Sequence, residues 1–236
     1  MTLGPEFVRG LRAALSGRLP WRIHKAEGGD SWVALKLGHD DLWLLFSWGS
    51  GTGGCCLADG GSVSALRKGA PARTPLVEAL RSRFVKGDLT AARQINHDRI
   101  LEFEVRRRVA AGAEVRYFLV LEATEPLGNL ILLDADRRIE ELARHEAPDR
   151  NPYRTLLPGH PYVPPPAFAG PLPEDLSSLD HDGAANIAGI GRPLSQFIRA
   201  HWEERSPEAW LLAVRDAGSD AILDRKSTRL NSSHLR

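Results

Sequence analysis

The chain has 236 residues, enough to bury a substantial hydrophobic core in one large or two small domains. Its 31 basic and 30 acidic residues nearly balance, so any basic surface for nucleic acid must be local. No stretch approaches the ~20 apolar residues of a membrane span, and the first residues lack the pattern of a secretory signal. The composition predicts a soluble, cytoplasmic protein whose adjacent cysteines, Cys55 and Cys56, form no disulfide.

Residues 7–19 place apolar side chains at every fourth position, which predicts an amphipathic helix. The runs at 21–23, 31–37 and 42–46 predict the strands of an antiparallel meander, because the turns between them are too short for crossover connections. The glycine-rich segment 49–54 that follows has the spacing of a dinucleotide fingerprint. No helical sequence comes after it, so we predict a flexible hairpin or loop.

A second helix is predicted from Pro75 to about Gly87. The strands of a second meander follow at 98–105, 117–121 and 129–134. In the first of these strands, apolar and acidic residues alternate from residue 101, the pattern of a strand with one face in the core.

Asp98 and Arg99 stand side by side where this strand opens. An acid and a guanidinium in that place either form an internal ion pair or present the guanidinium to an anionic ligand. The residues alone favour an ion pair across the meander and leave the ligand site open.

Residues 148–173 are rich in proline, which predicts an extended connector at a domain boundary. Residues 176–223 have a helical pattern in which Gly189, Gly191 and Arg192 fit the turn of a helix-hairpin-helix motif. Such a turn exposes backbone N–H groups at a helix N-terminus, a position suited to phosphate. These three residues are therefore candidate RNA contacts, and an ordinary helix–helix turn is the alternative.

No spacing typical of a metal site or a catalytic triad accompanies these motifs. Cys55 and Cys56 have neither a second cysteine pair nor a histidine nearby. The sequence therefore predicts no metal, no cofactor and no catalytic residue.

The C-terminal residues 224–236 have a separate interpretation. Residues 224–234 match one reading frame of a common short-read sequencing adapter codon by codon, so we predict that 224–236 are an artefact. A natural polar tail is the alternative. Subtracting the four Lys and Arg residues and the one Asp of this segment from the totals of 31 and 30 leaves 27 basic and 29 acidic side chains, a net charge of −2.

The order of motifs resembles the N-terminal domain of the NFACT family, which includes the bacterial RqcH or fibronectin-binding protein A group and the eukaryotic NEMF group. The resemblance is strongest over residues 74–166. Besides the Asp98-Arg99 pair, it rests on a set of family-motif residues with an expected structural role: Glu122, Asn129, Arg154, Pro158, Gly159 and Tyr162.

The resemblance implies an α+β fold of two lobes, each an antiparallel β-meander with flanking helices, similar to the N-terminal domain of formamidopyrimidine-type DNA glycosylases. Residues 1–170 are then the NFACT N-terminal domain, and residues 171–223 are the start of a helix-hairpin-helix domain. The chain is accordingly expected to be a fragment of a longer protein.

The resemblance also implies a ribosome-associated quality control factor. Such a factor binds large ribosomal subunits obstructed by peptidyl-tRNA and recruits charged tRNA, alanyl-tRNA in bacteria, so that the stalled chain receives a C-terminal tail without mRNA. The ribosome performs the peptidyl transfer, so the chain is expected to position tRNA rather than act as an enzyme, with no membrane partner. The tRNA contacts carry over to Asp98 and Arg99, where Arg99 grips a phosphate or stacks on a base.

Two departures from the family pattern concern this role. Gly4-Pro5 stands where the family has an acidic residue, and a glycine-cysteine run replaces an arginine-rich strand after residue 46. Two other functions stay open. A surface fibronectin-binding adhesin requires export, and a glycosylase-like nucleic-acid enzyme requires an N-terminal proline amine, whereas this chain starts Met1-Thr2.

Overall fold

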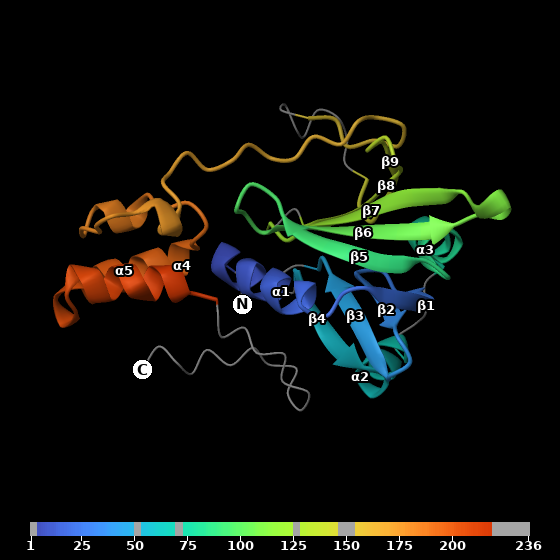
Figure 1. Cartoon of the computed structure of the whole chain (residues 1–236), viewed down its shortest axis with the longest axis horizontal. Helices are drawn as coiled ribbons and strands as arrows, with labels where there is room; N and C mark the ends of the chain where they lie inside the picture. The colour runs from blue at the N-terminus through green and yellow to red at the C-terminus, as the bar shows by residue number, and fades with distance from the viewer. Residues whose placement is uncertain (1–3, 50–52, 69–72, 125–127, 146–153, 219–236) are drawn as a thin grey trace.

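The computed structural model describes residues 4–49, 53–68, 73–124, 128–145 and 154–218 (Figure 1). The described residues form an α+β protein with nine strands in one antiparallel sheet, ordered β4-β3-β2-β1-β5-β6-β7-β8-β9. The α-helices are α1 (Pro5–Ser16), α2 (Gly60–Arg67), α3 (Pro75–Phe84), α4 (Arg192–Ala200) and α5 (Pro207–Asp216). The strands are β1 (Trp21–Gly28), β2 (Trp32–Leu37), β3 (Leu42–Ser47), β4 (Gly54–Asp59), β5 (Asp88–Gln94), β6 (Ile100–Arg108), β7 (Glu114–Glu122), β8 (Asn129–Leu133) and β9 (Ile139–Leu142).

The helices and strands expected up to residue 134 are present, with their ends moved by a few residues. Helix α1 begins at Pro5, because the fixed φ of proline suits the first position of a helix. Helix α3 begins where the hydroxyl of Thr74 accepts a hydrogen bond from the backbone N–H of Val77 at 3.3 Å.

The two expected meanders belong to one continuous nine-stranded sheet. Strand β5, which the sequence did not predict, pairs with β1 through Trp21 opposite Leu89 and with β6 along most of its length. The sheet folds over itself, and one buried cluster contains side chains of β2 and β3 together with those of β6, β7 and β8. At the centre of this cluster, the rings of Phe46 and Phe103 meet edge to face at 5.2 Å.

The segment 49–54, predicted as a hairpin or loop, connects the antiparallel neighbours β3 and β4, and the strand that follows it was not predicted. Residues Gly54–Asp59 form β4, which pairs with β3 through Cys55 opposite Phe46, while residues 50–52 lie outside the described part of the chain. Cys55 is buried and takes the role of a small apolar side chain. The carboxylate of Asp59 then caps α2 by accepting a hydrogen bond from the backbone N–H of Ser62 at 2.6 Å.

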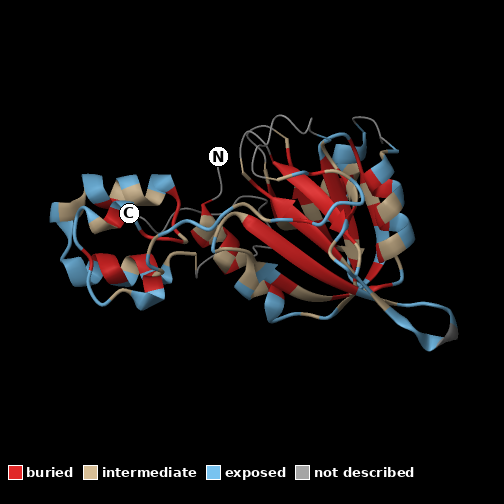
Figure 2. Cartoon of the chain, turned by 90° about the horizontal axis from the view of Figure 1, so that it is seen from above, coloured by how far each residue is buried: buried red, intermediate tan, exposed pale blue. Residues whose placement is uncertain are grey.

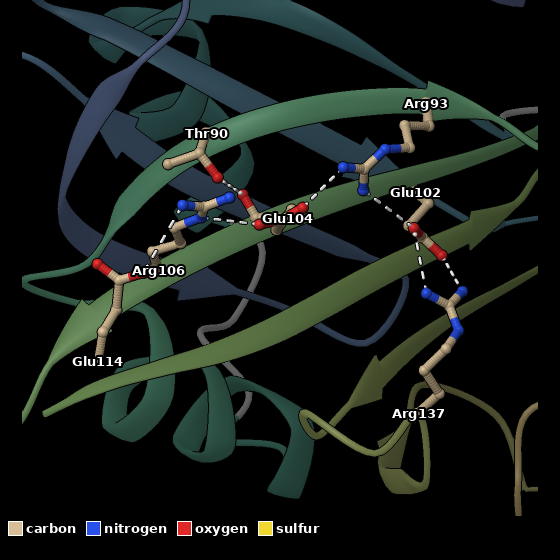
Figure 3. A network of polar contacts seen from close by, with 7 residues as sticks. All are labelled: Thr90, Arg93, Glu102, Glu104, Arg106, Glu114 and Arg137. Atoms are coloured by element: carbon tan, nitrogen blue, oxygen red, sulfur yellow. Dashed lines mark hydrogen bonds and ion pairs between the residues drawn. The ribbon is translucent and has the colours of Figure 1, made fainter.

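The second meander is buried on both faces, which the alternating sequence of β6 did not indicate. The face turned away from the first meander packs against the proline-rich segment through Leu156 and Tyr162. Glu102 and Glu104, expected to face solvent, are only 2% and 3% exposed because arginine side chains cover them. Their ionic network is shown in Figure 3.

The C-terminal helices lie at one end of the molecule, beside α1 (Figures 1 and 2). Trp210 and Ile198 anchor a small core of their own. Gly189 and Gly191 precede α4. Between β9 and this turn, the described residues contain two short 3-10 helices, Pro173–Asp175 and Gly183–Ala185, so an α-helix follows the turn but none directly precedes it. Within the described residues, no helix is long and apolar enough to span a membrane.

The contact between the two meanders is testable through Phe103, which is fully buried. We expect Phe103→Ala to lower the free energy of unfolding by about 3–5 kcal/mol, since a large cavity remains in the core. Leu212→Ala is the matched control, because Leu212 is 60% exposed and its truncation is expected to change stability by less than about 0.5 kcal/mol. Urea denaturation measures the free energy of unfolding of both variants. Similar losses of stability in the two would show that Phe103 does not anchor the contact between the meanders.

Candidate functional site

A cavity of about 830 Å³ lies where the turn between β5 and β6, the start of α1 and the start of α4 meet. It brings together two motifs that are far apart in the sequence, the Asp98-Arg99 pair and the glycine turn before α4. Every residue that the sequence proposed as an RNA contact lines this cavity: Asp98, Arg99, Gly189, Gly191 and Arg192.

The turn between β5 and β6 holds Asp98 and Arg99 at the cavity wall. Asn96 and His97 both have left-handed backbones, with φ of 53° and 52°, and the backbone N–H of Asp98 donates to the carbonyl of Ile95 at 3.0 Å. Two successive left-handed residues are typical of the tight turns that join antiparallel strands. The side-chain amide of Asn96 also donates to the carbonyl of Pro165 at 2.7 Å, which ties the turn to the proline-rich segment.

Arg99 does not form the ion pair across the meander that the residues alone favoured. Its carboxylate partner is the neighbouring Asp98, whose Oδ1 lies 3.8 Å from the guanidinium Nε. The same Oδ1 accepts a hydrogen bond from the backbone N–H of Arg99 at 2.7 Å. Asp98 therefore shapes the backbone of Arg99, whose side chain is 27% exposed and lines the cavity.

The turn before α4 needs a glycine at position 189 because of its backbone conformation. Gly189 has a φ of +78°, a left-handed backbone that favours glycine. Gly191 caps α4, and its backbone N–H donates to Oε2 of Glu6 at 2.7 Å. This donor, expected to be exposed to phosphate, is therefore already bound by a carboxylate.

Glu6 is the functional candidate that the sequence did not reveal. Its side chain is buried at the junction of α1 and α4, and it lies one residue beyond the Gly4-Pro5 position where the family's acid is missing. Burial raises the pKa of Glu6, while hydrogen bonds from its own and Gly191's backbone N–H groups and the charges of Arg9 and Arg99 oppose that rise. The signal in the sequence was an acidic residue in the first turn of the first helix.

Two further side chains line the cavity without any signal in the sequence. Phe168, in the proline-rich segment, is 57% exposed, and Arg199 is an exposed residue of α4. Together with Arg99 and Arg192, they give the cavity three guanidinium groups and one accessible aromatic ring. Phosphate and a planar base are the ligand groups that such side chains bind.

The family-motif residues form a separate, supporting cluster. The guanidinium of Arg154 makes two hydrogen bonds of 2.5 Å to the carboxylate of Glu122, and the hydroxyl of Tyr162 donates to the same carboxylate at 2.8 Å. Burial and the Glu122 charge raise the pKa of Tyr162. Because Glu122 lies opposite Ile100 in the sheet, the cluster fixes the strand that begins directly after Arg99.

The other motif residues hold the edge of the sheet. Oδ1 of Asn129 accepts hydrogen bonds from the backbone N–H groups of Leu130 and Arg144, and its amide donates to the carbonyl of Arg144 at 2.9 Å. Pro158 and Gly159 form a turn in which Gly159 has a φ of +84° and donates to the carbonyl of Ile139 at 2.7 Å. These residues do not line the cavity.

The fold and the cavity define an α+β protein with an arginine-lined pocket between a folded sheet and a helical segment. Residues 7–198 match the model of the NFACT N-terminal and middle domains. The chain therefore belongs to the NFACT family. In the described residues, no group of three His, Cys, Asp or Glu side chains is placed to hold a metal ion.

Similar proteins include the "Rqc2 homolog RqcH" of Streptococcus suis (strain 05ZYH33), 39% identical over 75 residues, which are 31% of this chain and 14% of that protein. The RqcH of Bacillus subtilis (strain 168) is 33% identical over 150 residues, 63% of this chain and 26% of that protein. The matches thus span about a quarter of these relatives or less.

Solved structures show the same fold. The N-terminal part of the fibronectin/fibrinogen-binding protein of Streptococcus suis superposes with a TM-score of 0.73 at 23% identity, covering 89% of this chain and 84% of that one. The fibrinogen binding protein of Staphylococcus aureus also gives a TM-score of 0.73, at 20% identity, covering 92% and 83%.

Glu122→Ala is expected to lower the free energy of unfolding by about 3–5 kcal/mol, because it leaves the guanidinium of Arg154, 10% exposed, without its carboxylate. Glu78→Ala is the control: it removes an exposed ion pair with Arg81, for which the expected cost is below about 1 kcal/mol. Chemical denaturation checks both. Equal effects would show that the cluster does not stabilise the fold.

The raised pKa of Glu6 predicts a pH dependence of stability. The folded state binds this proton more tightly than the unfolded state, so stability from this residue is present at low pH and declines as the pH rises above about 4.5. Glu6→Gln keeps an acceptor for Gly191 and removes the titration, so it is expected to flatten the decline. Unfolding curves at pH values below and above about 4.5 measure this difference. An identical decline of stability in the wild type and the variant would show that Glu6 does not cause the pH dependence.

Proposed function

We propose that this chain binds tRNA in the cavity, with Asp98 and Arg99 at the centre of the contact. In this proposal it acts as an RqcH-type factor of ribosome-associated quality control. It binds obstructed large ribosomal subunits and recruits alanyl-tRNA, so that stalled chains receive a C-terminal tail without mRNA. Residues 1–170 serve as the NFACT N-terminal domain, and residues 171–223 begin a helix-hairpin-helix domain.

One observation carries the proposal: two motifs that were selected independently in the sequence line the same cavity. Family membership and the partial similarity to RqcH proteins support the same function. The cavity residues suit binding more than chemistry, since they supply guanidinium groups and an aromatic ring.

The chemistry of the contact follows from the side chains. Arg99, Arg192 and Arg199 bind phosphate oxygens through charge-assisted hydrogen bonds, and Phe168 stacks on an unpaired base. Asp98 acts as a positioning residue, because it holds the backbone from which Arg99 extends. The ribosome performs peptidyl transfer, and the chain presents the tRNA to it.

The proposal predicts that Asp98→Ala/Arg99→Ala weakens tRNA binding at least about tenfold, since one charge-assisted hydrogen bond contributes about 1.5–3 kcal/mol. Fluorescence anisotropy with labelled tRNA measures the affinity. Arg18→Ala is the control, because Arg18 is exposed and does not line the cavity. Equal tRNA binding by the double variant and the wild type would refute the site.

The identity of the tRNA is tested separately. The tagged protein is recovered from cells, and the bound RNA is sequenced for the wild type and for Asp98→Ala/Arg99→Ala. We expect alanine tRNA to be enriched with the wild type and depleted with the variant. Enrichment of no tRNA, or of the same tRNA with both proteins, contradicts the proposed function.

A surface adhesin is the second candidate, because the similar solved structures are named for binding fibronectin or fibrinogen. At 20–23% identity these structures support the fold alone. Binding of the purified chain to immobilised fibronectin, with detection of the protein on intact cells, distinguishes this candidate. Surface display together with no affinity for tRNA would favour it.

A further inference from the structure

The outer face of the second meander contains two buried carboxylates and a larger number of arginines (Figure 3). Arg93 of β5 pairs with Glu102 at 3.5 Å and with Glu104 at 2.8 Å. Arg106 pairs with Glu104 at 2.8 Å, and Arg137, from the turn before β9, pairs with Glu102. Three guanidinium groups thus share the two buried carboxylates, and the exposed carboxylate of Glu114 lies 3.7 Å from Arg106.

The carboxylates lie beneath the guanidinium groups and orient them. The side chains of Arg93, Arg106 and Arg137 are 50%, 47% and 44% exposed, whereas those of the two glutamates are at most 4% exposed. Each arginine has five N–H donors, so donors remain on the exposed edges. Burial acts to raise the pKa of Glu104, but hydrogen bonds from Arg93 and Arg106 outweigh it and lower that pKa, which keeps the network ionised.

The positive charge continues along the hairpin of β6 and β7, which projects from the body of the molecule in Figure 2. Arg106 lies directly opposite Arg116 in the strand register, and like charges in that position destabilise a sheet. Arg108 comes next on the same face and is exposed. Within the described part of the chain, neither Arg108 nor Arg116 makes a side-chain hydrogen bond or ion pair. Glu114, 3.7 Å from Arg106, lies opposite Arg108 in the register, and Asp88, which pairs with Arg22, lies opposite Arg106.

This arrangement is unexplained by folding alone. The carboxylates of Glu102, Glu104 and Glu114 offset three of the five guanidinium groups on this face, and Arg116 lies opposite the like charge of Arg106. A polyanion bound along this face supplies the missing counter-charge. The aromatic ring in this region, Phe118, is buried beneath the guanidinium of Arg137 at 4.9 Å, so it offers no surface for stacking a base.

We propose that these arginines bind the phosphodiester backbone of double-helical RNA in the large ribosomal subunit. The set, called the arginine stripe below, comprises Arg93, Arg106, Arg108, Arg116 and Arg137. Arginine side chains bind phosphate oxygens, and contacts to phosphate carry no sequence information. The inference rests on the proposed function, because it names a second RNA surface on a protein proposed to hold tRNA in its cavity.

The far end of the stripe lies well away from the cavity. Asp98 and Arg99 precede the first residue of β6, and Arg108 is its last. At about 3.3 Å per residue, Arg108 lies about 26 Å from the start of this strand, whereas Arg93 and Arg137 pair with Glu102 near the end of the strand that faces the cavity. A ligand that fills the cavity therefore leaves Arg108 and Arg116 free.

The test uses Arg108→Gln/Arg116→Gln, because both side chains are exposed and neither has a partner in the described residues that the fold would lose. Purified large ribosomal subunits, protein-free ribosomal RNA and tRNA are the three probes. We expect affinity for the subunit and for its RNA to fall at least about tenfold, and the slope of log affinity against log salt to decrease by about two, one for each phosphate contact. Affinity for tRNA should stay unchanged.

Two controls make the result specific. Arg18→Gln/Lys25→Gln removes the same charge from exposed positions outside the stripe and should leave every affinity unchanged. Asp98→Ala/Arg99→Ala should weaken tRNA binding and leave subunit binding intact, which separates failure of the stripe from failure of the cavity.

Several results would overturn the proposal. One is an unchanged subunit affinity in the stripe variant, and another is a wild-type chain that does not bind subunits. Loss of tRNA affinity in place of subunit affinity would assign the stripe to tRNA. Loss of subunit affinity with unchanged binding to protein-free ribosomal RNA would identify an acidic ribosomal protein as the partner.

Discussion

The carboxylate of Glu122 organises the part of the molecule where the cavity forms. It lies at the end of β7, 1% exposed, and accepts hydrogen bonds from Arg154 and Tyr162. A buried carboxylate without partners is strongly unfavourable, so the chain that carries Arg154 and Tyr162 must lie against the end of the sheet. That chain is the proline-rich segment, which goes on to bind the Asn96 turn and to place Phe168 at the cavity.

The same principle recurs at the other carboxylates of the interior. Glu6 joins α1 to the start of α4, and Glu102 and Glu104 join β6 to arginines of neighbouring segments. In each case the buried acid meets a backbone N–H group or an arginine side chain, on the same or a neighbouring strand for Glu104 and in a more distant segment for Glu6. Four acids are buried among the described residues and no arginine is, so a chain with a nearly neutral total charge can still display positive surfaces where these acids lie beneath arginines.

This separation of charge reconciles the composition with a proposed role in RNA binding. An overall charge near zero gives no long-range attraction to RNA. The cavity and the arginine stripe instead concentrate guanidinium groups at two places, held in position by the acids beneath or beside them. Such oriented groups lose little conformational freedom on binding, and this lowers the cost of forming each contact.

The sequence by itself determined the elements with strong periodicity and the residues of the family motifs. The sequence predicted helix α1, the apolar strands and the Asp98-Arg99 pair, because apolar spacing and local motifs are properties of neighbouring residues. The sequence predicted neither strand β5 nor the burial of Glu102. Strand β5 pairs with β1, and Arg137 covers Glu102, so both features depend on residues distant in the sequence. The strand formed by the glycine-cysteine run was missed because its partner β3, rather than its own residues, imposes that conformation.

For the site, the sequence supplied the candidates and the tertiary structure decided their arrangement. Asp98, Arg99 and the glycine turn were selected separately, and only the folded chain shows that they line one cavity. Glu6 could not have been assigned to Gly191 from the sequence, because 185 positions separate them and the hydrogen bond forms only when α1 packs against the start of α4. Local patterns thus identify residue types suited to RNA, whereas their joint position depends on long-range packing and on the pairing of buried charges.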